Sequence, residues 1–471
     1  MYTGRVRRAL RTIITTLLVI ASHAGCSQEP AKDTACEPCA PILLYAVDGL
    51  EWSVIQPLIE QGRMPVMAEL MRRGTYGHLE TIEPTWSPVI WTTMATGKLP
   101  DEHGIEGFVY RVGPGDDGQR FYTSGHRATK AFWNILSDYG RTVNCLGWWM
   151  TYPAEPIHGV MVAQTNTTAV LHNSENALLK GTVLRGVEDQ VYPPARQDEV
   201  MDILDHVDSS FDSVLTAIFG RVPVPSTGFT TVLWEQSQWA FRADAVYLAA
   251  TRKLLESRAP FDITAVYVGA TDVVAHRFWQ YAYPQQFKNP PDAKEIASFG
   301  PVIDDYYAHI DRALGQLIAA APANTTVIVV SDHGHHAVNI EHEFSLADEP
   351  EMRLSGNHMD APPGVFIAAG PNIAARAPGG ALTAPDPARP VGHAFDMLPT
   401  LLALQGIPLG QDFVGKPMAN VIDPEFLARV PVRTVRTHDD RAWDEARRTR
   451  IKEAADRAER LEQLRSLGYI K

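Results

Sequence analysis

Short apolar runs alternate with amphipathic stretches along most of this 471-residue chain. Runs of a few apolar residues are typical of buried β-strands, and they occur in the segments 42–47, 75–82, 142–149, 263–272, 325–334 and 364–371. Helical spacing appears between them, in 52–73 with a break at Pro65, from about Thr92 onward, and in 241–258, 302–319 and 395–404. Strands that alternate with helices predict a three-layer α/β/α sandwich whose polar strand ends share one edge of the sheet.

Two parts of the chain depart from this alternation. Between about 155 and 255 the hydrophobic period weakens and turn residues cluster, which predicts a cap inserted into a single domain spanning 42–425. Residues 426–471 carry interleaved charges of both signs on a helix-favouring background, which is typical of a solvent-exposed helix. We therefore expect one α/β domain with an inserted cap and a charged helical C-terminal tail.

Residues 1–25 have the composition of an export signal. A basic segment precedes an apolar stretch, residues 13–21, that is too short to span a bilayer. Small residues then lead to Cys26, as in the lipobox of bacterial lipoproteins, although His23 stands where an aliphatic residue is usual. We predict that Cys26 is lipidated and that residues 26–41 form a tether. The protein would then be membrane-anchored in a bacterial cell envelope, facing the periplasm or the exterior.

Two alternatives for export stay open. Cleavage near Cys26 without lipidation would leave a soluble periplasmic protein. The pair Arg7-Arg8 also resembles the start of a twin-arginine signal.

Composition narrows the classes of partner. The hydrophobic fraction of 45% and the charged fraction of 21% are ordinary for a soluble globular protein. A net charge of −13 argues against a groove for a nucleic-acid polymer. It does not argue against a small phosphorylated substrate, because bound metal ions reverse the local field. The four cysteines are too few for a zinc ribbon, and Cys145 lies in an apolar run typical of a core.

Acidic and histidine residues cluster where strand patterns end. Asp48 follows the first apolar run, and the pair Asp332-His333 follows a later one. Asp272 and His276 are four residues apart, so one face of a helix would hold both. Histidine and carboxylate ligands without cysteine fit a divalent metal of intermediate softness, with zinc as the first choice and manganese as the second. Two clusters predict two ions about 3.5–4 Å apart, as in metal-assisted hydrolases.

The segments around these residues resemble those of a known family. The motifs are AVDG at 46–49, SPVIWTTMATGKLPDEHGI at 87–105, GATDVVAHRFW at 269–279, VVSDHG at 329–334 and GNHMDAPPGVFIAAGP at 356–371. Together they resemble the type I phosphodiesterases/nucleotide pyrophosphatases of the alkaline phosphatase superfamily, over roughly residues 42–410. The resemblance implies a fold of the alkaline phosphatase type, two divalent metal ions and a covalent mechanism on a small phosphorylated substrate.

Matching positions imply a role for each site residue. One ion would be held by Asp48, Asp332 and His333, with Ser87 also touching it, and the other by Asp272, His276 and His358. Ser87 would be the nucleophile, because it precedes Thr96 of the Thr-Gly pair by nine positions, as the nucleophile does in the family. A serine hydroxyl is weakly nucleophilic by itself, so contact with a metal would activate it to form a phosphoseryl intermediate.

Neighbouring residues compete for these roles. Thr85 is a second candidate hydroxyl, and His393 is a second candidate for the place given to His358. The histidines at 335–336 extend the SDHG run, and we expect them at the surface or beside a metal ligand. His103 is expected to fix the turn after the helix that carries the nucleophile.

One position departs from the family pattern. An asparagine that contacts the phosphate in nucleotide pyrophosphatases is replaced here by Phe108, and no lysine or arginine is evident for a second phosphate charge. We therefore predict a phosphodiesterase-type hydrolase of phosphoric esters. A phosphomonoesterase or a phospho-headgroup transferase on the same site is the alternative. The pair Trp148-Trp149 is expected in the core, or along a cap pocket for a base or sugar ring.

Other classes of function fit less well. A sulfatase needs a C/S-x-P-x-R signature, and SPVIW lacks that arginine; a serine triad on an α/β-hydrolase fold needs a G-x-S-x-G elbow, which this sequence lacks. A surface lipoprotein that binds without catalysing is an alternative of another class. A decayed site would have lost ligands, whereas all the expected metal ligands and the hydroxyl are present. The sequence therefore favours an enzyme.

Overall fold

The computed structural model describes residues 39–111, 119–168, 179–338, 354–360, 362–375 and 382–451. The predicted signal peptide, Cys26, nearly all of the tether and residues 452–471 of the tail lie outside these ranges, so these assignments stay predictions. Among the described residues, no helix combines the length and the apolar character needed to cross a membrane.

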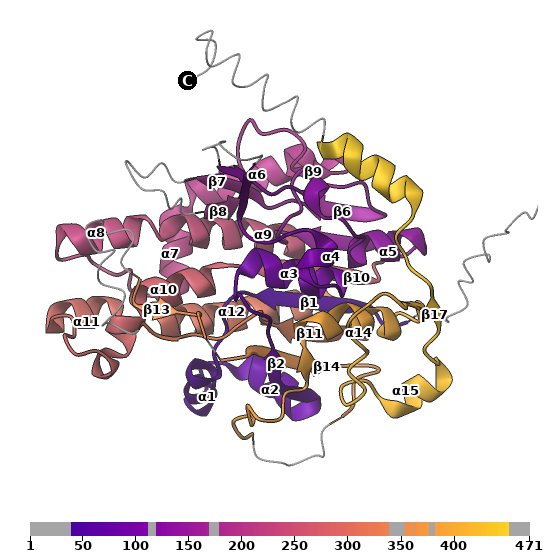
Figure 1. Ribbon diagram of the computed structural model, residues 1–471. Helices are drawn as coiled ribbons and strands as arrows, with labels where there is room; N and C mark the ends of the chain where they lie inside the picture. The colour runs from indigo at the N-terminus through magenta and orange to yellow at the C-terminus, as the bar shows by residue number, and fades with distance from the viewer. Residues whose placement is uncertain are drawn as a thin grey trace, which may run out of the picture. The chain divides into compact units, whose positions relative to one another are not determined.

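A central β-sheet organises the described residues (Figure 1). Its strands are β1 (Ile42–Val47), β2 (Thr75–Glu80), β5 (Val143–Leu146), β6 (Gly159–Val162), β9 (Val191–Tyr192), β10 (Ile263–Val268), β11 (Thr326–Val330), β14 (Gly364–Ala369) and β15 (Gly392–His393). The nine strands lie in the order β15-β2-β14-β11-β1-β10-β5-β6-β9. β14 is antiparallel to both neighbours and β9 is antiparallel to β6. β1 is parallel to β10 and to β11, so these three strands end at the same edge.

Smaller sheets and the helices complete the fold. The smaller sheets pair β3 (Val109–Arg111) with β4 (Gln119–Phe121), β7 (Thr165–Thr168) with β8 (Leu179–Thr182), β12 (His336–Ala337) with β13 (Gly356–Asn357), and β16 (Leu409–Gly410) with β17 (Thr434–Val435). The α-helices are α1 (Trp52–Glu60), α2 (Pro65–Arg73), α3 (Ser87–Thr96), α4 (Pro100–His103), α5 (Phe132–Asp138), α6 (Gln197–Ser209), α7 (Phe211–Phe219), α8 (Gly228–Glu235), α9 (Gln238–Glu256), α10 (Ala270–Ala282), α11 (Ala293–Phe299), α12 (Val302–Ala320), α14 (Met397–Leu404) and α15 (Pro424–Arg429). Short 3-10 helices are η1 (Ser124–His126), η2 (Pro194–Arg196), η3 (Pro284–Gln286) and η6 (Ala394–Asp396).

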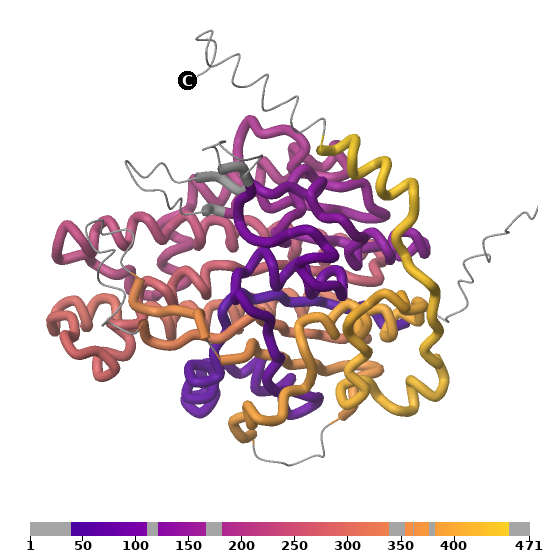
Figure 2. Tube along the Cα trace, viewed as in Figure 1, coloured from indigo at the N-terminus to yellow at the C-terminus, as the bar shows by residue number. Residues whose placement is uncertain are grey.

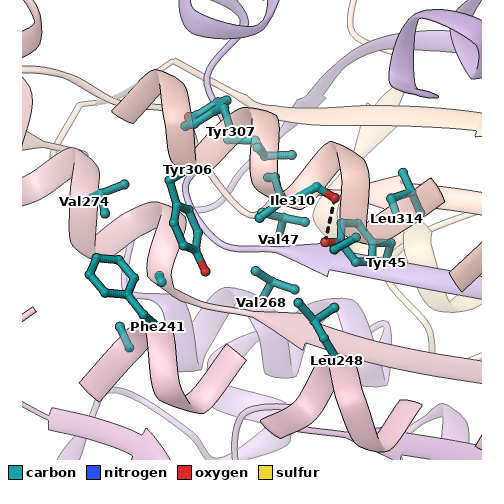
Figure 3. Packing of buried hydrophobic residues seen from close by; sticks show 14 of the residues in the cluster. Tyr45, Val47, Phe241, Leu248, Val268, Val274, Tyr306, Tyr307, Ile310 and Leu314 are labelled. Carbon is teal, nitrogen blue, oxygen red and sulfur yellow. Dashed lines mark hydrogen bonds between the residues drawn. The ribbon is translucent and has the colours of Figure 1, made fainter. Parts of the chain in front are cut away.

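Two apolar layers flank the central sheet. β1 is buried throughout, and because side chains alternate along a strand, Tyr45 and Val47 enter one layer while Leu44 enters the other. Residues of α1, α2, α9, α10 and α12 form the first layer, and residues of α3, α5 and α14 form the second. Figure 3 shows the first layer, where the Tyr45 hydroxyl donates to the carbonyl of Ile310 at 3.1 Å. The predicted three-layer α/β/α sandwich is confirmed.

Helix α3 begins earlier than the sequence predicted. The pattern predicted a start at about Thr92, whereas the helix starts at Ser87. Pro88 lies in the first helical turn, where its missing N–H is not needed. Gly97 ends the helix with a φ of 64°, a conformation that glycine adopts easily. The earlier start brings the Ser87 hydroxyl to Asp48, directly after β1.

The range predicted as a cap, about 155–255, contributes to the central sheet. β6 and β9 lie within this range and are the last two strands at one edge of the sheet. Phe241 and Val246 of α9 belong to the first apolar layer. β6 and β9 are four and two residues long, too short for a hydrophobic period to be recognised. The β7–β8 hairpin forms a separate small sheet, whereas buried residues of α6, α7 and α8 belong to the first apolar layer.

Candidate active site

The predicted site residues meet at the carboxyl ends of β1, β10 and β11. Asp48 directly follows β1, and Asp332 and His333 follow β11. Asp272 and His276 lie on the first turns of α10, which follows β10. Two of the groups of side chains with metal-binding atoms within 4.8 Å of one another are Asp48–Asp332–His333 and Asp272–His276–His358. The structure therefore brings together both predicted ligand sets.

The first group lies beside the predicted nucleophile. Nε2 of His333 lies 3.3 Å from Oδ2 of Asp332 and 3.5 Å from Oδ1 of Asp48. The Oγ atom of Ser87 lies 3.4 Å from the same Asp48 oxygen. All four side chains are buried. The serine hydroxyl is thus placed beside the atoms that would hold one ion.

Asp272 of the second group also meets His335, which the sequence placed at the surface or beside a metal ligand. Nε2 of His276 lies 3.3 Å from Oδ1 of Asp272, and Nε2 of His335 lies at the same distance from that oxygen. Asp272, His333 and His335 form a further group of potential metal-binding atoms. His358 stacks on His333 with ring centroids 3.9 Å apart and so connects the two groups.

The atoms in both groups have the properties of metal ligands. Within the described part of the chain, Oδ1 of Asp272, Oδ2 of Asp332 and Nε2 of His333 are buried without a hydrogen-bond partner. Buried polar atoms are rarely left without partners. Ligands bound to a tetrahedral zinc ion at about 2.0–2.1 Å lie about 3.3 Å from one another, close to the separations of 3.3–3.5 Å seen here. The residues present therefore fit two divalent ions.

Surrounding groups fix the orientation of the candidate ligands. Oδ2 of Asp48 accepts hydrogen bonds from Nε1 of Trp91 at 3.1 Å and from the Tyr267 hydroxyl at 2.5 Å. That hydroxyl accepts in turn from Nε1 of Trp149 at 2.9 Å. Nδ1 of His276 faces the carbonyl of Gly356 at 2.8 Å, which leaves Nε2 directed at Asp272. Such partners commonly hold metal ligands in place.

Sequence reasoning missed two of these supporting residues. Trp91 lies four residues after Ser87, so it shares a face of α3 with the serine, and this spacing was available as a signal. Tyr267 lies on β10, whose neighbour is β1. The strand pairing that brings Tyr267 to Asp48 has no local signature in the sequence.

Three carboxylates in one buried site influence one another. Burial and the nearby Asp272 raise the pKa of Asp48 to about 7. Burial and Asp48 raise the pKa of Asp332 well above its ordinary value. Burial also acts to raise the pKa of Asp272, but His276 and His335 outweigh it and hold that pKa well below its ordinary value. Positive ions at this place would relieve the repulsion among these carboxylates.

Except for His276, the histidines of the site have lowered pKa values and so favour the neutral form that binds metals. Burial, followed by the neighbouring His335, lowers the pKa of His333 to about 3. Burial and His333 lower the pKa of His358 far below its ordinary value. His276 differs, because Asp272 outweighs burial and raises its pKa. Neutral imidazole is the form in which histidine ligates metal ions.

The competing residues lie apart or have other partners. The Thr85 hydroxyl donates to the carbonyl of His358 at 2.7 Å. His393 lies on β15 and pairs with Glu80 at 2.8 Å, outside the groups of candidate ligands. His336 is half-buried, and its Nε2 lies 2.8 Å from the Met359 carbonyl. His103 is buried between Thr93 and the N–H of Ile105, which agrees with its expected structural role after α3.

A cavity of about 390 Å³ opens beside Ser87. Its lining includes the candidate ligands Asp48, Asp272, His276 and His358, and the aromatic residues Phe108 and Trp149. Phe108, which replaces the family's asparagine, meets Trp149 edge-on at 5.7 Å between ring centroids. Trp148 packs in the core against Trp91, so the two neighbouring tryptophans have different roles.

Comparisons with solved structures give distant likenesses. Wild-type alkaline phosphatase PafA has a TM-score of 0.49 at 13% identity, over 83% of this chain and 100% of that one. Human ectonucleotide pyrophosphatase/phosphodiesterase 5 has a TM-score of 0.44 at 14% identity, over 83% and 99%. Phosphonoacetate hydrolase from Sinorhizobium meliloti 1021 has a TM-score of 0.36 at 17% identity, over 64% of this chain and 57% of that enzyme. No curated protein matches the chain.

A family profile gives the decisive comparison. The profile described as "Type I phosphodiesterase / nucleotide pyrophosphatase" matches residues 42–384, which is most of the chain. The matched range contains Ser87 and both groups of candidate ligands. It also agrees with the resemblance carried by the sequence motifs. The chain belongs to the type I phosphodiesterase/nucleotide pyrophosphatase family, a family of phosphoric-ester hydrolases.

Proposed function

We propose that this protein is a metal-dependent hydrolase of phosphoric esters that prefers diesters and acts through a phosphoseryl intermediate on Ser87. The observation that carries the proposal is the meeting of two groups of metal-binding side chains at one buried serine hydroxyl. Membership of the phosphodiesterase family supports the same reaction class.

Two divalent ions, zinc or else manganese, would supply the positive charge that activates the serine hydroxyl and stabilises the leaving oxygen. Asp48 keeps its place because Trp91 and Tyr267 bind its Oδ2 atom. The Ser87 oxygen forms a bond to phosphorus as the bond from phosphorus to the ester oxygen breaks, and the alcohol leaves with a proton. Water then adds to phosphorus and releases the serine, so the reaction consumes one water.

The surroundings of Ser87 favour a diester over a monoester. A monoester brings an additional negative charge, which calls for a cationic partner. Among the described residues that line the cavity there is no lysine, and the single arginine, Arg277, bonds to the Ser237 hydroxyl at 3.1 Å. Phe108 adds an apolar wall where the family has a polar amide. An organic ester group would be better accommodated there than a second charge.

The test compares bis-p-nitrophenyl phosphate with p-nitrophenyl phosphate. The purified protein is stripped with a chelator and assayed before and after zinc or manganese is restored. Metal-dependent turnover with higher kcat/KM for the diester is the expected result. Higher kcat/KM for the monoester would make the protein a phosphatase instead. No turnover of either compound by protein that holds two ions would contradict hydrolysis and favour a phospho-headgroup transferase.

The sequence of the N-terminus supports a proposal for where the enzyme acts. We propose that Cys26 carries lipid and that the enzyme acts at a bacterial cell envelope, facing the periplasm or exterior. The small residues before Cys26 support this. In an expressing bacterium, the full-length protein should be recovered with the membranes, and Cys26→Ala should move it to the soluble fraction. Membrane association that survives this change would contradict the lipid anchor.

A further inference from the structure

Asp48 is the first residue of the turn 48–51, which connects β1 to α1. The N–H of Leu50 in this turn donates to Oγ of Ser331 at 2.8 Å, across 281 positions of the sequence. Ser331 is fully buried, so water has no direct access to this bond. A buried backbone N–H destabilises the fold unless it is paired. The position of the turn therefore depends on a side chain from outside it.

Ser331 also joins the segments that supply the first group of candidate ligands. Its Oγ donates to the carbonyl of His333 at 3.0 Å, and Oδ1 of the adjacent Asp332 accepts from the N–H of Gly49 at 3.2 Å. Asp48 lies on the turn after β1, whereas Asp332 and His333 lie on the segment after β11. The hydroxyl of Ser331 therefore holds together two segments that must meet around one ion.

Tyr307 binds the same turn from α12. Its hydroxyl accepts from the N–H of Glu51 at 3.1 Å and donates to the carbonyl of Gly49 at 3.2 Å. The side chain is fully buried in the first apolar layer, where Figure 3 labels it. The groups of candidate ligands found in the described residues include none from α12. The connection from Tyr307 to the site therefore runs through the turn.

Gly49 shows how closely the turn approaches the rest of the site. Its φ of 68° is one that residues with a side chain rarely adopt. A Cβ atom at this position would lie 2.6 Å from the ring of His335 and 3.1 Å from Cα of Asp272. The turn thus has no room to shift toward these residues, and its hydrogen bonds to Ser331 and Tyr307 keep it from moving away.

We infer that Ser331 and Tyr307 are positioning residues that hold Asp48 where it binds an ion together with Asp332 and His333. Neither side chain offers a ligand atom to the ion, and each acts on the affinity for that ion through the backbone of the turn. The inference rests on the proposed function, because it takes this group of side chains as the site of one of the two ions. It predicts an effect on this ion and none on the ion of the second group.

Zinc affinity measured one site at a time tests the inference. In the full-length protein, Asp272→Ala leaves the first group intact, and Asp332→Ala leaves the second. Adding Tyr307→Phe to Asp272→Ala should weaken zinc binding by about 10- to 100-fold, because the turn loses two of its hydrogen bonds. Adding it to Asp332→Ala should change zinc binding by less than about 2-fold. Competition with a chromophoric chelator measures the dissociation constants.

Ser331→Ala tests the second hydroxyl in the same two backgrounds. It leaves the Leu50 N–H and the His333 carbonyl without this partner, so it should weaken zinc binding by the first group alone. If the Ser331 variant does not fold, Tyr307→Phe still decides the question.

Tyr45→Phe is the matched control for Tyr307→Phe. Its hydroxyl is buried in the same apolar layer but donates to the Ile310 carbonyl and not to the turn. Each variant loses a buried hydrogen bond, so the melting temperature of the metal-free protein should fall by roughly 2–4 °C in both. Tyr45→Phe should nevertheless leave zinc affinity unchanged.

Equal zinc affinities with and without Tyr307→Phe in the Asp272→Ala protein, or no zinc binding by that protein, would overturn the inference. Equal weakening in both backgrounds, or the same weakening by Tyr45→Phe, would also overturn it, because either result would indicate a general loosening of the fold. Turnover of bis-p-nitrophenyl phosphate by the wild-type protein tests the proposed function separately. Absence of turnover by protein that holds two ions contradicts that function, whereas the zinc affinities decide the inference by themselves.

Discussion

The two oxygens of Asp48 have different partners. Oδ2 receives hydrogen bonds from Trp91 and Tyr267, whereas Oδ1 faces Ser87 and His333. Because Oδ2 is held by two donors from different elements, the carboxylate cannot turn without breaking both bonds. Trp91 and Tyr267, which are not candidate ligands, thereby set the position of the Asp48 Oδ1 atom beside Ser87.

Ser87→Ala should abolish turnover and leave metal content intact. The hydroxyl is the group expected to bond to phosphorus, whereas three other side chains of its group are available to hold the ion. Loss of turnover by about 10³-fold or more is expected for removal of a nucleophile, measured together with metal content by elemental analysis. Thr85→Ala is the control, since that hydroxyl bonds to the His358 carbonyl. Activity that survives in the Ser87 variant and disappears in the Thr85 variant would reverse the assignment.

His103 should make stability depend on pH. Its Nδ1 accepts from the N–H of Ile105 at 3.1 Å, and burial, together with Arg127, lowers its pKa to about 3. The unfolded chain takes up this proton near pH 6.5, so the stability contribution is complete above pH 6.5 and is lost as pH falls toward 3. At pH 5 the loss is about 2 kcal/mol.

Urea unfolding of the chelated protein at pH 8 and pH 5 measures this effect. His103→Gln should be less stable than wild type at pH 8 but should lose less on acidification. Equal losses in the two proteins would show that His103 is not the titrating group.

At the level of elements, two helices begin on carboxylates supplied by other helices. Asp244 of α9 accepts from the N–H groups of Gly269 and Ala270 at the start of α10. Asp311 of α12 accepts in the same way from Val66 and Met67 at the start of α2. Such carboxylates satisfy free N–H groups and favour the positive end of the helix dipole. Of the two helices, α10 carries candidate metal ligands and α2 does not. Asp311 is therefore the control for Asp244.

Asp244→Asn and Asp311→Asn should separate stability from metal binding. Each change replaces one acceptor oxygen by an N–H donor, so each should cost about 1–3 kcal/mol of unfolding free energy. A displaced start of α10 would also move Asp272, so Asp244→Asn should weaken zinc binding by about 10-fold. Asp311→Asn should leave zinc affinity at the wild-type value. Zinc titration against a chromophoric chelator measures this, and equal affinities in both variants would contradict a link from Asp244 to the site.

Across the whole described chain, the C-terminal segment packs against residues far away in sequence. Figure 2 shows this yellow segment beside the purple part of the chain, where Arg450 pairs with the buried Glu155 at 3.1 Å and lies over the ring of Trp443. Burial raises the pKa of Glu155, but Arg127 and Arg450 outweigh it and hold that pKa below its ordinary value. The helical residues 441–451 are therefore fixed at Trp443 and Arg450, whereas most of the other residues of this segment are exposed, as expected for a solvent-exposed helix.

Arg450→Ala should destabilise the protein through this contact. It removes one of two cations that face a fully buried carboxylate, so a loss of about 2 kcal/mol is expected. Arg441→Ala is the matched control on the same helical segment, since its partner Glu445 is exposed, and it should cost less than about 0.5 kcal/mol. Chemical unfolding measures both. Equal effects would mean that the contact with Glu155 does not anchor the C-terminal segment.

The sequence by itself determined most strands and helices and the residue types of the site. The apolar runs of β1, β10 and β11 are recognisable because a strand buried on both faces has few polar residues. The polar residues that follow them, Asp48 and Asp332, then stand out. The family motifs added Ser87 and His358 at matching positions.

Only the tertiary structure decided which other residues support the site. Tyr267 reaches Asp48 because β10 pairs with β1 across more than 200 residues, and His335 reaches Asp272 in the same non-local way. Local patterns report what each segment prefers, whereas these contacts depend on how segments far apart in sequence are packed.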